Sequence, residues 1–340
     1  MAATGTGRGA EDSAPGAAPR VSVAMLAYNH ERFIAQALAG VCMQVTRAAV
    51  EVVVGEDHST DRTREVIADF QRTHPGRIDV LTAPRNLGMI PNFVRTLRAC
   101  RGDYVALLEG DDYWTSPEKL QKQVDFLDGH RGCAICFHDA EVRYEDGSQP
   151  PRLACGPGIR EITTVEDLLI TNYIPTCSVM FRNRLIPEFP DWFLGSRFGD
   201  WPLHLLNARH GDIGYINEVL AVYRKHPAGA WATMAEAQKR LETVRMYEHL
   251  DVCLGGAHHG TIRGLVGQQH YRLARLYGKS GDLRAARAHL AKSLLAKPLN
   301  RRMPVWRWLL LAARLYAPGA GRRGAPSSPP AGRTEDDLRV

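Results

Sequence analysis

The sequence predicts an α/β protein whose mostly parallel sheet carries helices on both faces, followed by an all-helical C-terminal extension. Between residues 21 and 140, short apolar runs rich in β-branched side chains alternate with stretches in which apolar residues recur at helical spacing. Single helices between successive strands are typical of parallel pairing, because parallel strands need a crossover connection. From about residue 232 only the helical spacing remains.

The elements follow in order along the chain. Buried strands are expected at 21–27, 50–55, 78–81, 104–108 and 134–137. Helices are expected between them at 31–43, 60–73, 89–100 and from Pro117 onward. Ser59 or Thr60 is expected to cap the second helix, and Ser116 the last, with Pro117 in its first position. Two further apolar runs, 177–181 and 213–223, and a helix hairpin at 271–295 complete the pattern.

These patterns divide the chain into four parts. Residues 1–20 are rich in Ala, Gly and Pro and are expected to be disordered. Residues 21–231 are expected to form the catalytic domain, and residues 232–317 a helical extension with a basic last helix. Residues 318–340, rich in Gly, Pro, Arg and Ser, are expected to be a disordered tail.

Charge and composition exclude several classes of protein. Of the 340 residues, 44% are hydrophobic and 24% are charged, which is typical of a globular protein. The net charge of +6 arises near the C-terminus, where residues 298–323 hold six arginines and no acid. The rest of the chain is nearly neutral, so no nucleic-acid partner is expected.

The same reading favours a cytoplasmic protein. No apolar run is long enough to span a membrane, and the N-terminus lacks the apolar region of a secretory signal. The seven cysteines are scattered through apolar stretches, which indicates reduced thiols. Cys133 and Cys136 are expected to pack in the core, since they have no second pair with which to bind zinc.

The candidate site lies in the loops that follow the strands, where ligands of such sheets bind. Glu109, Asp111 and Asp112 follow the strand at 104–108. Adjacent carboxylates repel one another unless a cation lies among them, and Mg²⁺ or Mn²⁺ takes oxygen ligands while keeping positions open for phosphate. The alternative is a plain turn before a helix start, where acids are favourable.

Two more loops are expected at the same edge. Asp57 follows the strand at 50–55 and could accept hydrogen bonds from a ribose or an imide N–H; otherwise it is a turn residue. The segment 84–88 places a flexible Gly88 after the third strand, and on its own it favours a plain loop.

Together these segments resemble the family 2 glycosyltransferases of GT-A fold. The matching segments cover about 21–230 in order, namely Tyr28-Asn29, Glu56-Asp57-His58-Ser59-Thr60-Asp61, Asn86-Leu87-Gly88, Gly102-Asp103-Tyr104 and Glu109-Gly110-Asp111-Asp112-Tyr113-Trp114. Three positions depart from the family pattern: Glu56 and Glu109 stand where Asp is usual, and His58 replaces Gly. Glu reaches one methylene further, and His58 either narrows the choice of base or is tolerated in the turn.

The resemblance implies roles for individual residues. Asp57 would contact the nucleotide base or ribose, in a pocket lined by Ala27, Tyr28 and Glu31. Asp111 would coordinate the metal, and Asp112 would assist at the metal or donor sugar. The remaining residues expected at the nucleotide sugar are Asn86, Gly88 and Glu109.

A catalytic base is expected at Asp200. An inverting displacement needs a carboxylate that removes the proton of the acceptor hydroxyl. Asp200 precedes Trp201 and Pro202 at a helix start, in a Gly-Asp-Trp-Pro run that resembles a bacterial subset of the family. The alternative role is helix capping, and Asp191 is a weaker rival for the base. Trp201, Thr176 and Ser178 are expected near the acceptor.

Cationic and aromatic residues after the run at 213–223 complete the expected site. Arg224 and His226 could pair with a diphosphate or complete the metal shell, and Trp231 could close over the sugar or acceptor. The alternative is a basic strand end with the tryptophan packed on a helix.

These inferences predict a metal-dependent, inverting glycosyltransferase that acts in cell-surface polysaccharide or lipopolysaccharide assembly. It would use a nucleotide-diphosphate sugar, a UDP-sugar above others, and a glycan or lipid-linked acceptor. A nucleotidyltransferase is disfavoured, because the first loop lacks a Gly-rich basic segment; a non-catalytic nucleotide-sugar-binding or scaffold protein is the alternative. The basic, apolar segment 301–323 favours peripheral binding to an anionic membrane surface at the inner face of the cell membrane, against a helix packed on the hairpin.

Overall fold

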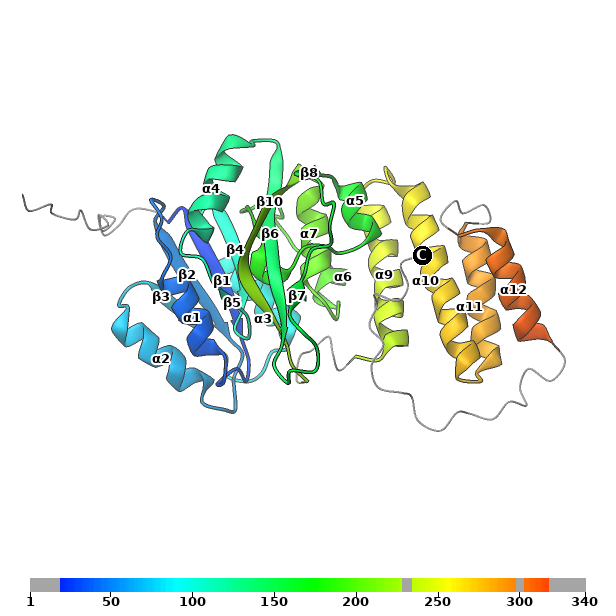
Figure 1. The fold of residues 1–340 in the computed structure, drawn as a ribbon, viewed down its shortest axis with the longest axis horizontal. Coiled ribbons are helices and arrows are strands. Elements are labelled where there is room, and N and C mark those ends of the chain that lie inside the picture. Colours follow the sequence, from blue (N-terminus) through cyan, green and yellow to red (C-terminus); the bar gives the residue numbers. More distant parts are fainter. Residues whose placement is uncertain (1–18, 228–233, 298–302, 318–340) are drawn as a thin grey trace, which may run out of the picture. The chain divides into compact units, whose positions relative to one another are not determined.

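A computed structural model describes residues 19–227, 234–297 and 303–317 (Figure 1). The chain divides into two compact units, the first ending at Thr233 and the second beginning at Met234. The segments expected to be disordered lie almost wholly outside the described residues, and so does Trp231.

The first unit begins with four parallel strands. Their order across the sheet is β3-β2-β1-β4, and single helices connect them, as the alternating pattern predicts. The strands are β1 (Val21–Ala27), β2 (Val50–Glu56), β3 (Ile78–Leu81) and β4 (Tyr104–Glu109). The connecting helices are α1 (Ile34–Cys42), α2 (Thr63–Thr73) and α3 (Met89–Ala99).

The sheet continues from β4 through strands of mixed direction, in the order β4-β9-β6-β10-β5. The short strand β9 (Met180–Arg182) lies antiparallel between β4 and β6 (Cys133–Tyr144), whereas β10 (Asp212–Lys225) runs parallel to β6. The remaining strands pair antiparallel at the margins: β5 (Tyr113–Trp114), β7 (Arg152–Leu153) and β8 (Ile162–Thr163). The apolar runs at 134–137 and 177–181 predicted the positions of β6 and β9, but they did not predict that β9 runs antiparallel to its neighbours.

Helices cover both faces of this sheet. Buried side chains of α1, α2 and α4 (Lys119–Gly129) share one core with alternate residues of β1, β2 and β4. On the opposite face α3 packs against β2, where a Cβ on Gly55 would lie 2.0 Å from Oγ1 of Thr96. Glycine is therefore required at position 55 for α3 to approach. The other helical segments of this unit are α5 (Val165–Ile170), the 3₁₀ turn η1 (Thr176–Ser178), α6 (Asp191–Leu194) and α7 (Asp200–Ala208).

Two helices begin later than the capping signals predicted. Helix α2 starts at Thr63, and the carboxylate of Asp61 accepts hydrogen bonds from both the amide (3.0 Å) and the hydroxyl (2.5 Å) of Thr63. Helix α4 starts at Lys119, two residues beyond Pro117. In both places the polar side chain organises a turn that precedes the helix, because Asp and Ser bond readily to nearby backbone amides.

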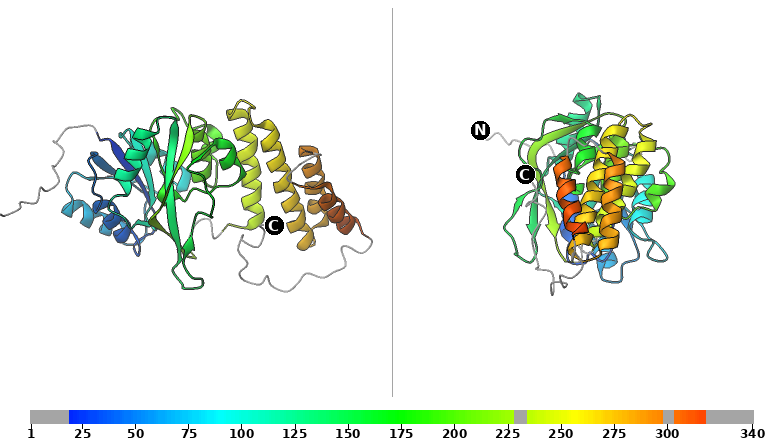
Figure 2. Two further views of the ribbon diagram at one scale, coloured as in Figure 1. Left: turned by 45° about the horizontal axis from the view of Figure 1, so that its top comes forward. Right: turned by 90° about the vertical axis from the view of Figure 1, so that its right-hand side faces the viewer.

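The second unit is an array of antiparallel helices that lie side by side in chain order (Figures 1 and 2). Its helices are α9 (Glu236–Cys253), α10 (His259–Lys279), α11 (Leu283–Ala296) and α12 (Val305–Tyr316). The predicted hairpin is confirmed: Gly281 adopts a positive φ of 84°, and Asp282 caps α11 by accepting from the amide of Ala285 at 2.9 Å.

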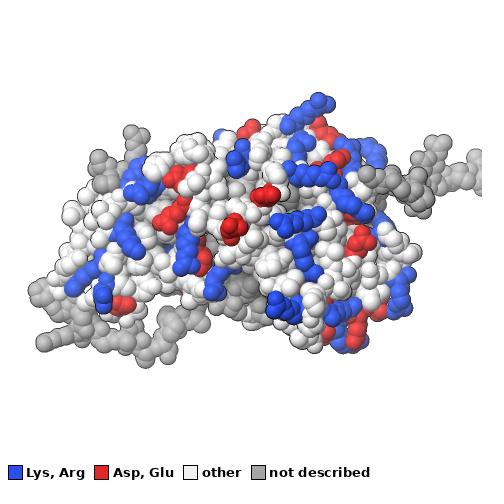
Figure 3. All heavy atoms as spheres, turned by 180° about the vertical axis from the view of Figure 1, so that it is seen from behind, with Lys and Arg blue, Asp and Glu red and all other residues white. Residues whose placement is uncertain are grey.

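Surface charge and hydropathy agree with the composition. Figure 3 shows basic and acidic side chains interspersed over the face that it displays. Within the described residues, no helix combines the length and the apolar character that crossing a bilayer requires. All seven cysteines are free thiols; Cys133 and Cys136 belong to the core of the first unit.

Candidate active site

The loops that follow β1 and β2 are joined by hydrogen bonds into one layer. The side-chain oxygen of Asn29, a residue with φ of 55°, accepts from the amide of Thr60 at 2.8 Å. Asp61 accepts from the amide of Glu31 (3.0 Å), while Glu31 accepts from the amide of Arg62 (2.9 Å). The predicted pocket residues Tyr28 and Glu31 therefore lie in a rigidly supported loop, where Tyr28 is 43% exposed.

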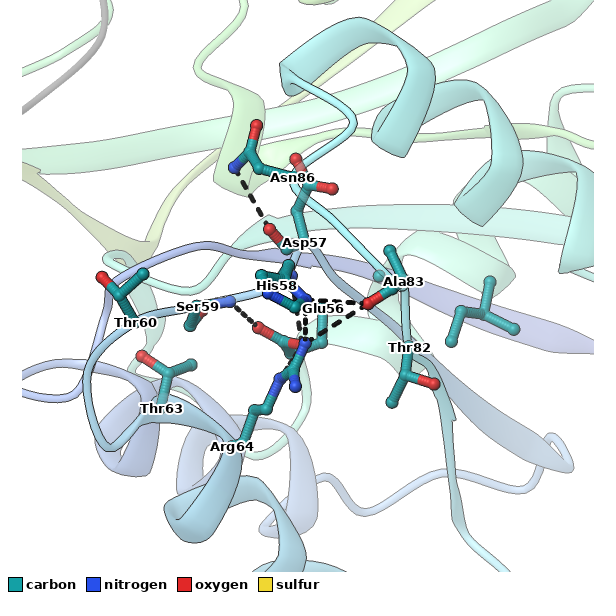
Figure 4. A network of polar contacts seen from close by, with 12 residues as sticks. Glu56, Asp57, His58, Ser59, Thr60, Thr63, Arg64, Thr82, Ala83 and Asn86 are labelled. Carbon is teal, nitrogen blue, oxygen red and sulfur yellow. Dashed lines mark hydrogen bonds and ion pairs between the residues drawn. The ribbon is translucent and has the colours of Figure 1, made fainter.

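Glu56 organises the loop after β2 from beneath (Figure 4). Its fully buried carboxylate accepts from the amide of Ser59 at 2.6 Å and from Nε of Arg64 at 2.5 Å. Burial raises the pKa of Glu56, but the bonds from Ser59 and Arg64 outweigh it and hold that pKa below its ordinary value. The longer side chain of Glu56, compared with the Asp usual at this position, thus forms hydrogen bonds within the protein, to Ser59 and Arg64.

His58 takes the conformation for which the family pattern has glycine. Its φ is 61°, in the left-handed region that costs a non-glycine residue about 1 kcal/mol. The ring compensates through a 3.0 Å contact of Nδ1 with the carbonyl of Ala83 and lies beside Arg64 (Figure 4). His58 is thereby tied to the loop after β3.

Asp57 joins the loops after β2 and β3. Its two carboxylate oxygens accept from the amides of Leu87 (2.8 Å) and Gly88 (2.9 Å), and Asn86 donates to its carbonyl at 3.1 Å. Gly88 has φ of 90°, which favours glycine. The structure brings Asp57, Asn86 and Gly88 together, with Ala27 beside them through the Asp57 amide. A carboxylate oxygen has two acceptor sites, so Asp57 retains capacity for a further donor, although the residue is only 2% exposed.

The two acids of the β4 loop face different ways. Asp112 is 1% exposed, and its Oδ1 accepts from the backbone amide of Arg224 at 2.8 Å. The Asp111 side chain is 19% exposed and points toward two histidines: Oδ2 lies 2.9 Å from Nε2 of His226 and 4.0 Å from Nε2 of His30. Asp111 is therefore the more accessible of the two acids, while Oδ1 of Asp112 joins its loop to the end of β10.

Arg224 is a structural cation here, which corrects the expectation that it could pair directly with a diphosphate. It is 7% exposed, and its guanidinium donates to Glu145 (3.0 Å), to the carbonyl of Asp111 (2.8 Å) and to Gln36. The rings of Phe33 and Tyr113 lie against it, with centroids at 5.0 and 4.4 Å. These contacts join the end of β10 to the segment after β4, to α1 and to the residue that follows β6.

The acids affect one another strongly. Burial, followed by the charges of Asp111 and Asp200, raises the pKa of Glu109 to about 8. Burial would also raise the pKa of Asp111, but the hydrogen bond from His226 and the charges of His30 and His226 outweigh it and lower that pKa. A pocket of this kind favours a bound cation.

The residues present fit a divalent ion held in part by its substrate. No group of three His, Cys, Asp or Glu side chains is arranged around a metal position in the described part of the chain. The Asp111–His226 pair offers one oxygen and one nitrogen, 2.9 Å apart. Ligands about 2.1 Å from an octahedral ion lie about 3 Å from each other, and Mg²⁺ and Mn²⁺ leave positions for phosphate oxygens and water.

Asp200 is the first residue of α7. Its Oδ2 accepts from Nδ2 of Asn172 at 3.0 Å, and burial raises its pKa. Its charge also contributes to the raised pKa of Glu109, so Asp200 lies near the acidic loop. The rival Asp191 is exposed at the start of the short helix α6.

The residues expected at the acceptor are only partly accessible. Ser178 is fully buried in η1, and its hydroxyl donates to the carbonyl of Pro175 at 2.7 Å, so it is unable to contact an acceptor. Thr176 is half-buried, and Trp201 is half-buried with its Nε1 on the carbonyl of Leu168 at 2.9 Å. Asn172 begins the segment 172–178 that the sequence places near the acceptor, and His30 lies in the polar loop after the first strand, but the sequence pattern assigns neither residue a role of its own.

The chain is similar in sequence to several known proteins. The family model "Glycosyl transferase family 2" matches residues 22–186. The uncharacterized protein Rv1520 of Mycobacterium tuberculosis is 36% identical over 282 residues, which cover 82% of this chain and 80% of the relative. TuaG of Bacillus subtilis, whose name describes a teichuronic acid biosynthesis glycosyltransferase, is 29% identical over 208 residues, 61% of this chain and 79% of TuaG.

Solved structures share the fold at low sequence identity. TarS 1–349 of S. aureus, crystallised with UDP-GlcNAc, matches with a TM-score of 0.62 and 18% identity over 87% of this chain and 85% of its own. The mannosyltransferase PcManGT of Pyrobaculum calidifontis, in complex with GDP-Man and Mn²⁺, matches with a TM-score of 0.51 and 18% identity over 88% and 87%. With this α/β fold, the strand-end acids and the family match, the chain belongs to the family 2 glycosyltransferases.

Proposed function

We propose that this chain is an inverting glycosyltransferase that moves a sugar from a nucleotide-diphosphate sugar, a UDP-sugar above others, to an acceptor hydroxyl. The observation that supports the proposal is the gathering of acids around Glu109, whose pKa is raised by burial and by the charges of Asp111 and Asp200. One acid is paired with a histidine in a position fit for a cation, and the other stands at a helix start with a raised pKa. The proposal thus places the donor and acceptor functions beside the same group of acids.

The reaction follows from these positions. Asp200 takes the proton of the acceptor hydroxyl while the acceptor oxygen forms a bond to the anomeric carbon of the donor. The bond from that carbon to the diphosphate breaks on the opposite face, so the anomeric configuration inverts. A raised pKa makes Asp200 a stronger base than an ordinary aspartate, and Asn172 orients it.

Asp111 and His226 are the residues that would hold Mg²⁺ or Mn²⁺, which supplies charge neutralisation to the leaving diphosphate. Asp57, Asn86 and Gly88, with Ala27, Tyr28 and Glu31, are proposed to bind the nucleoside. Glu109 is proposed to face the donor sugar. Trp201 and Thr176 are proposed to border the acceptor.

We propose that the enzyme acts in the cytoplasm, in the assembly of a polysaccharide that is destined for the cell surface. TuaG carries a teichuronic acid name, and TarS was crystallised with UDP-GlcNAc. Free cysteines throughout are typical of a reducing compartment. The acceptor would be a glycan or lipid-linked saccharide.

A matched pair of variants tests the proposal. A thermal-shift panel of UDP, GDP, dTDP and CMP with and without Mn²⁺ first identifies the donor nucleotide, since ligands that bind the folded form raise Tm. Transfer is then measured with the corresponding donor sugar. Asp200→Asn is expected to lower kcat about 10²–10⁴-fold while the donor-induced Tm shift persists.

The control is Asp191→Asn, which removes the exposed rival acid and is expected to leave kcat unchanged. Normal turnover by Asp200→Asn would refute the base assignment. A panel in which no nucleotide shifts Tm would favour the non-catalytic scaffold instead.

A further inference from the structure

Helix α12 is apolar on two opposite faces, and the described residues of the chain cover one of them. Trp308, Leu311 and Leu315 are buried against α10 and α11, where Nε1 of Trp308 donates to Ser293 at 3.0 Å. The spacing of these three residues places them on a single stripe of the helix. This face accounts for the packing of α12 as the last helix of its unit (Figure 2).

The opposite face exposes large apolar side chains to solvent. Trp306 is 55% exposed, Leu309 65%, Leu310 53% and Tyr316 61%, and Val305 extends the group. At 100° per residue these positions span one side of the helix, about 160° from the buried stripe. Surface helices of water-soluble units carry polar residues there, so a contiguous apolar face needs an occupant.

Charge on the helix identifies the kind of occupant. Arg307 and Arg314 are exposed and lie together along one flank of the exposed apolar face, where the guanidinium of Arg307 lies 5.5 Å from the centroid of the Trp306 ring. The sequence between residues 298 and 323 holds six arginines and no acid. An apolar strip with tryptophan and tyrosine beside arginines matches the boundary between acyl chains and anionic headgroups.

We propose that the exposed face of α12, formed by Val305, Trp306, Leu309, Leu310 and Tyr316, binds the surface of an anionic lipid bilayer. The helix lies in the interface with its apolar face toward the acyl chains and Arg307 and Arg314 at the headgroups. At 12 residues it is too short to span a bilayer, which requires about 20 residues. The proposal does not depend on the transfer reaction.

Vesicle flotation of the full chain tests this surface. Wild type is expected to float with phosphatidylcholine vesicles that contain phosphatidylglycerol, and less with phosphatidylcholine alone. The variant Trp306→Gln/Leu309→Gln/Leu310→Gln is expected to lose at least about tenfold in partitioning, because three apolar side chains no longer enter the bilayer. Arg307→Gln/Arg314→Gln is expected to lose about fivefold per arginine on anionic vesicles only.

Two controls make the result decisive. Val252→Gln alters an apolar side chain that is 81% exposed on α9 of the same unit, and it is expected to float like wild type. The triple variant should keep its Tm, since the changed side chains are already in water. Asp200→Asn should float normally, which separates this proposal from the proposed function.

The proposal is overturned if the triple variant floats like wild type or if wild type floats with neither kind of vesicle. It is also overturned if light scattering shows a dimer that the triple variant abolishes. In that case the face joins two copies of this chain.

Discussion

The Oδ2 atom of Asp111 lies 2.9 Å from Nε2 of His226, although 115 residues separate them in the sequence. The neighbouring pair fixes this relationship: Asp112 accepts from the amide of Arg224, and Arg224 donates to the carbonyl of Asp111. The loop after β4 and the end of β10 are therefore joined twice behind the accessible pair. Such support holds ligands in place before substrate arrives.

Removing either member of the Asp111–His226 pair should abolish Mn²⁺-dependent nucleotide binding. Asp111→Asn and His226→Gln keep the side-chain volume but remove the charge or the imidazole ligand. Adding Mn²⁺ to the nucleotide is expected to give no further increase in the Tm of these variants. The stabilisation by a ligand is RT ln(1 + [L]/Kd), so the part that depends on Mn²⁺ disappears when Mn²⁺ no longer improves the affinity. Asp191→Asn serves as a charge-matched control and should retain the full increase. A Mn²⁺-dependent shift that survived in both pair variants would remove this pair from the metal site.

Asn172 should set the acidic limit of activity. Burial raises the pKa of Asp200, and the hydrogen bond from Asn172 opposes that rise by favouring the ionised form. A base is active when ionised, so kcat should fall as pH drops through the raised pKa. Asn172→Leu should move this limb of the pH–rate profile to higher pH and leave the plateau rate of ionised enzyme closer to wild type.

The control for that profile is Asn217→Leu, an exposed asparagine on β10 that has no carboxylate partner among the described contacts. Its acidic limb should coincide with that of wild type. If Asn172→Leu lowered kcat by the same factor at every pH, the contact would be structural and Asp200 would not be the titrating base.

Glu56 should contribute to stability through its charge. Glu56→Gln weakens the bonds from Ser59 and from Arg64, whose side chain is 40% exposed, and is expected to cost about 1–2 kcal/mol of unfolding free energy by urea denaturation at pH 7. The pKa of Glu56 is lowered in the folded protein, so this contribution is present above the ordinary glutamate range and is lost as pH falls through the folded value. The difference between wild type and Glu56→Gln should shrink in that acidic window.

Glu65→Gln is the matched control, because Glu65 pairs with Arg62 on the same helix but is 67% exposed. Its effect should stay below about 1 kcal/mol at any pH. Equal, pH-independent losses in the two variants would mean that the carboxylate of Glu56 acts through shape and not through charge.

The sequence predicted the edge at which the site forms, because consecutive parallel strands bring their carboxyl ends together. Asp57, Asn86 and Gly88 come from loops about 30 residues apart and meet as expected. The departures at Glu56 and His58 were visible in the sequence too. Their reason was not, since it lies in contacts with Arg64 and the carbonyl of Ala83.

What the sequence did not reveal depends on long-range packing. Arg224 reads as a free cation at a strand end, yet its partners Gln36 and Glu145 lie 188 and 79 residues away. Ser178 reads as an exposed hydroxyl, but a 3₁₀ turn has no strong periodic signature and buries it. The sequence does not reveal the direction of β9 either, because an apolar run of three residues is compatible with parallel and with antiparallel pairing.

Lys119 should lower the free energy of unfolding at neutral pH, and this loss should disappear at alkaline pH. Its ammonium group is buried 3.8 Å from the Trp114 ring centroid, and Nζ has no hydrogen-bond partner in the part of the chain described. Burial lowers its pKa to about 7, so between there and the ordinary value of 10.5 the unfolded chain binds a proton that the folded chain does not. Stability should therefore rise with pH across that window.

Lys119→Met should abolish the rise and stabilise the protein by about 1–4 kcal/mol at pH 6.5, measured by urea denaturation at pH 6.5 and 9. Lys122→Met, three residues along the same helix and paired with Glu218, should show no such gain. A Lys119→Met protein less stable than wild type at pH 6.5 would show that attraction to Trp114 exceeds the cost of burying the charge.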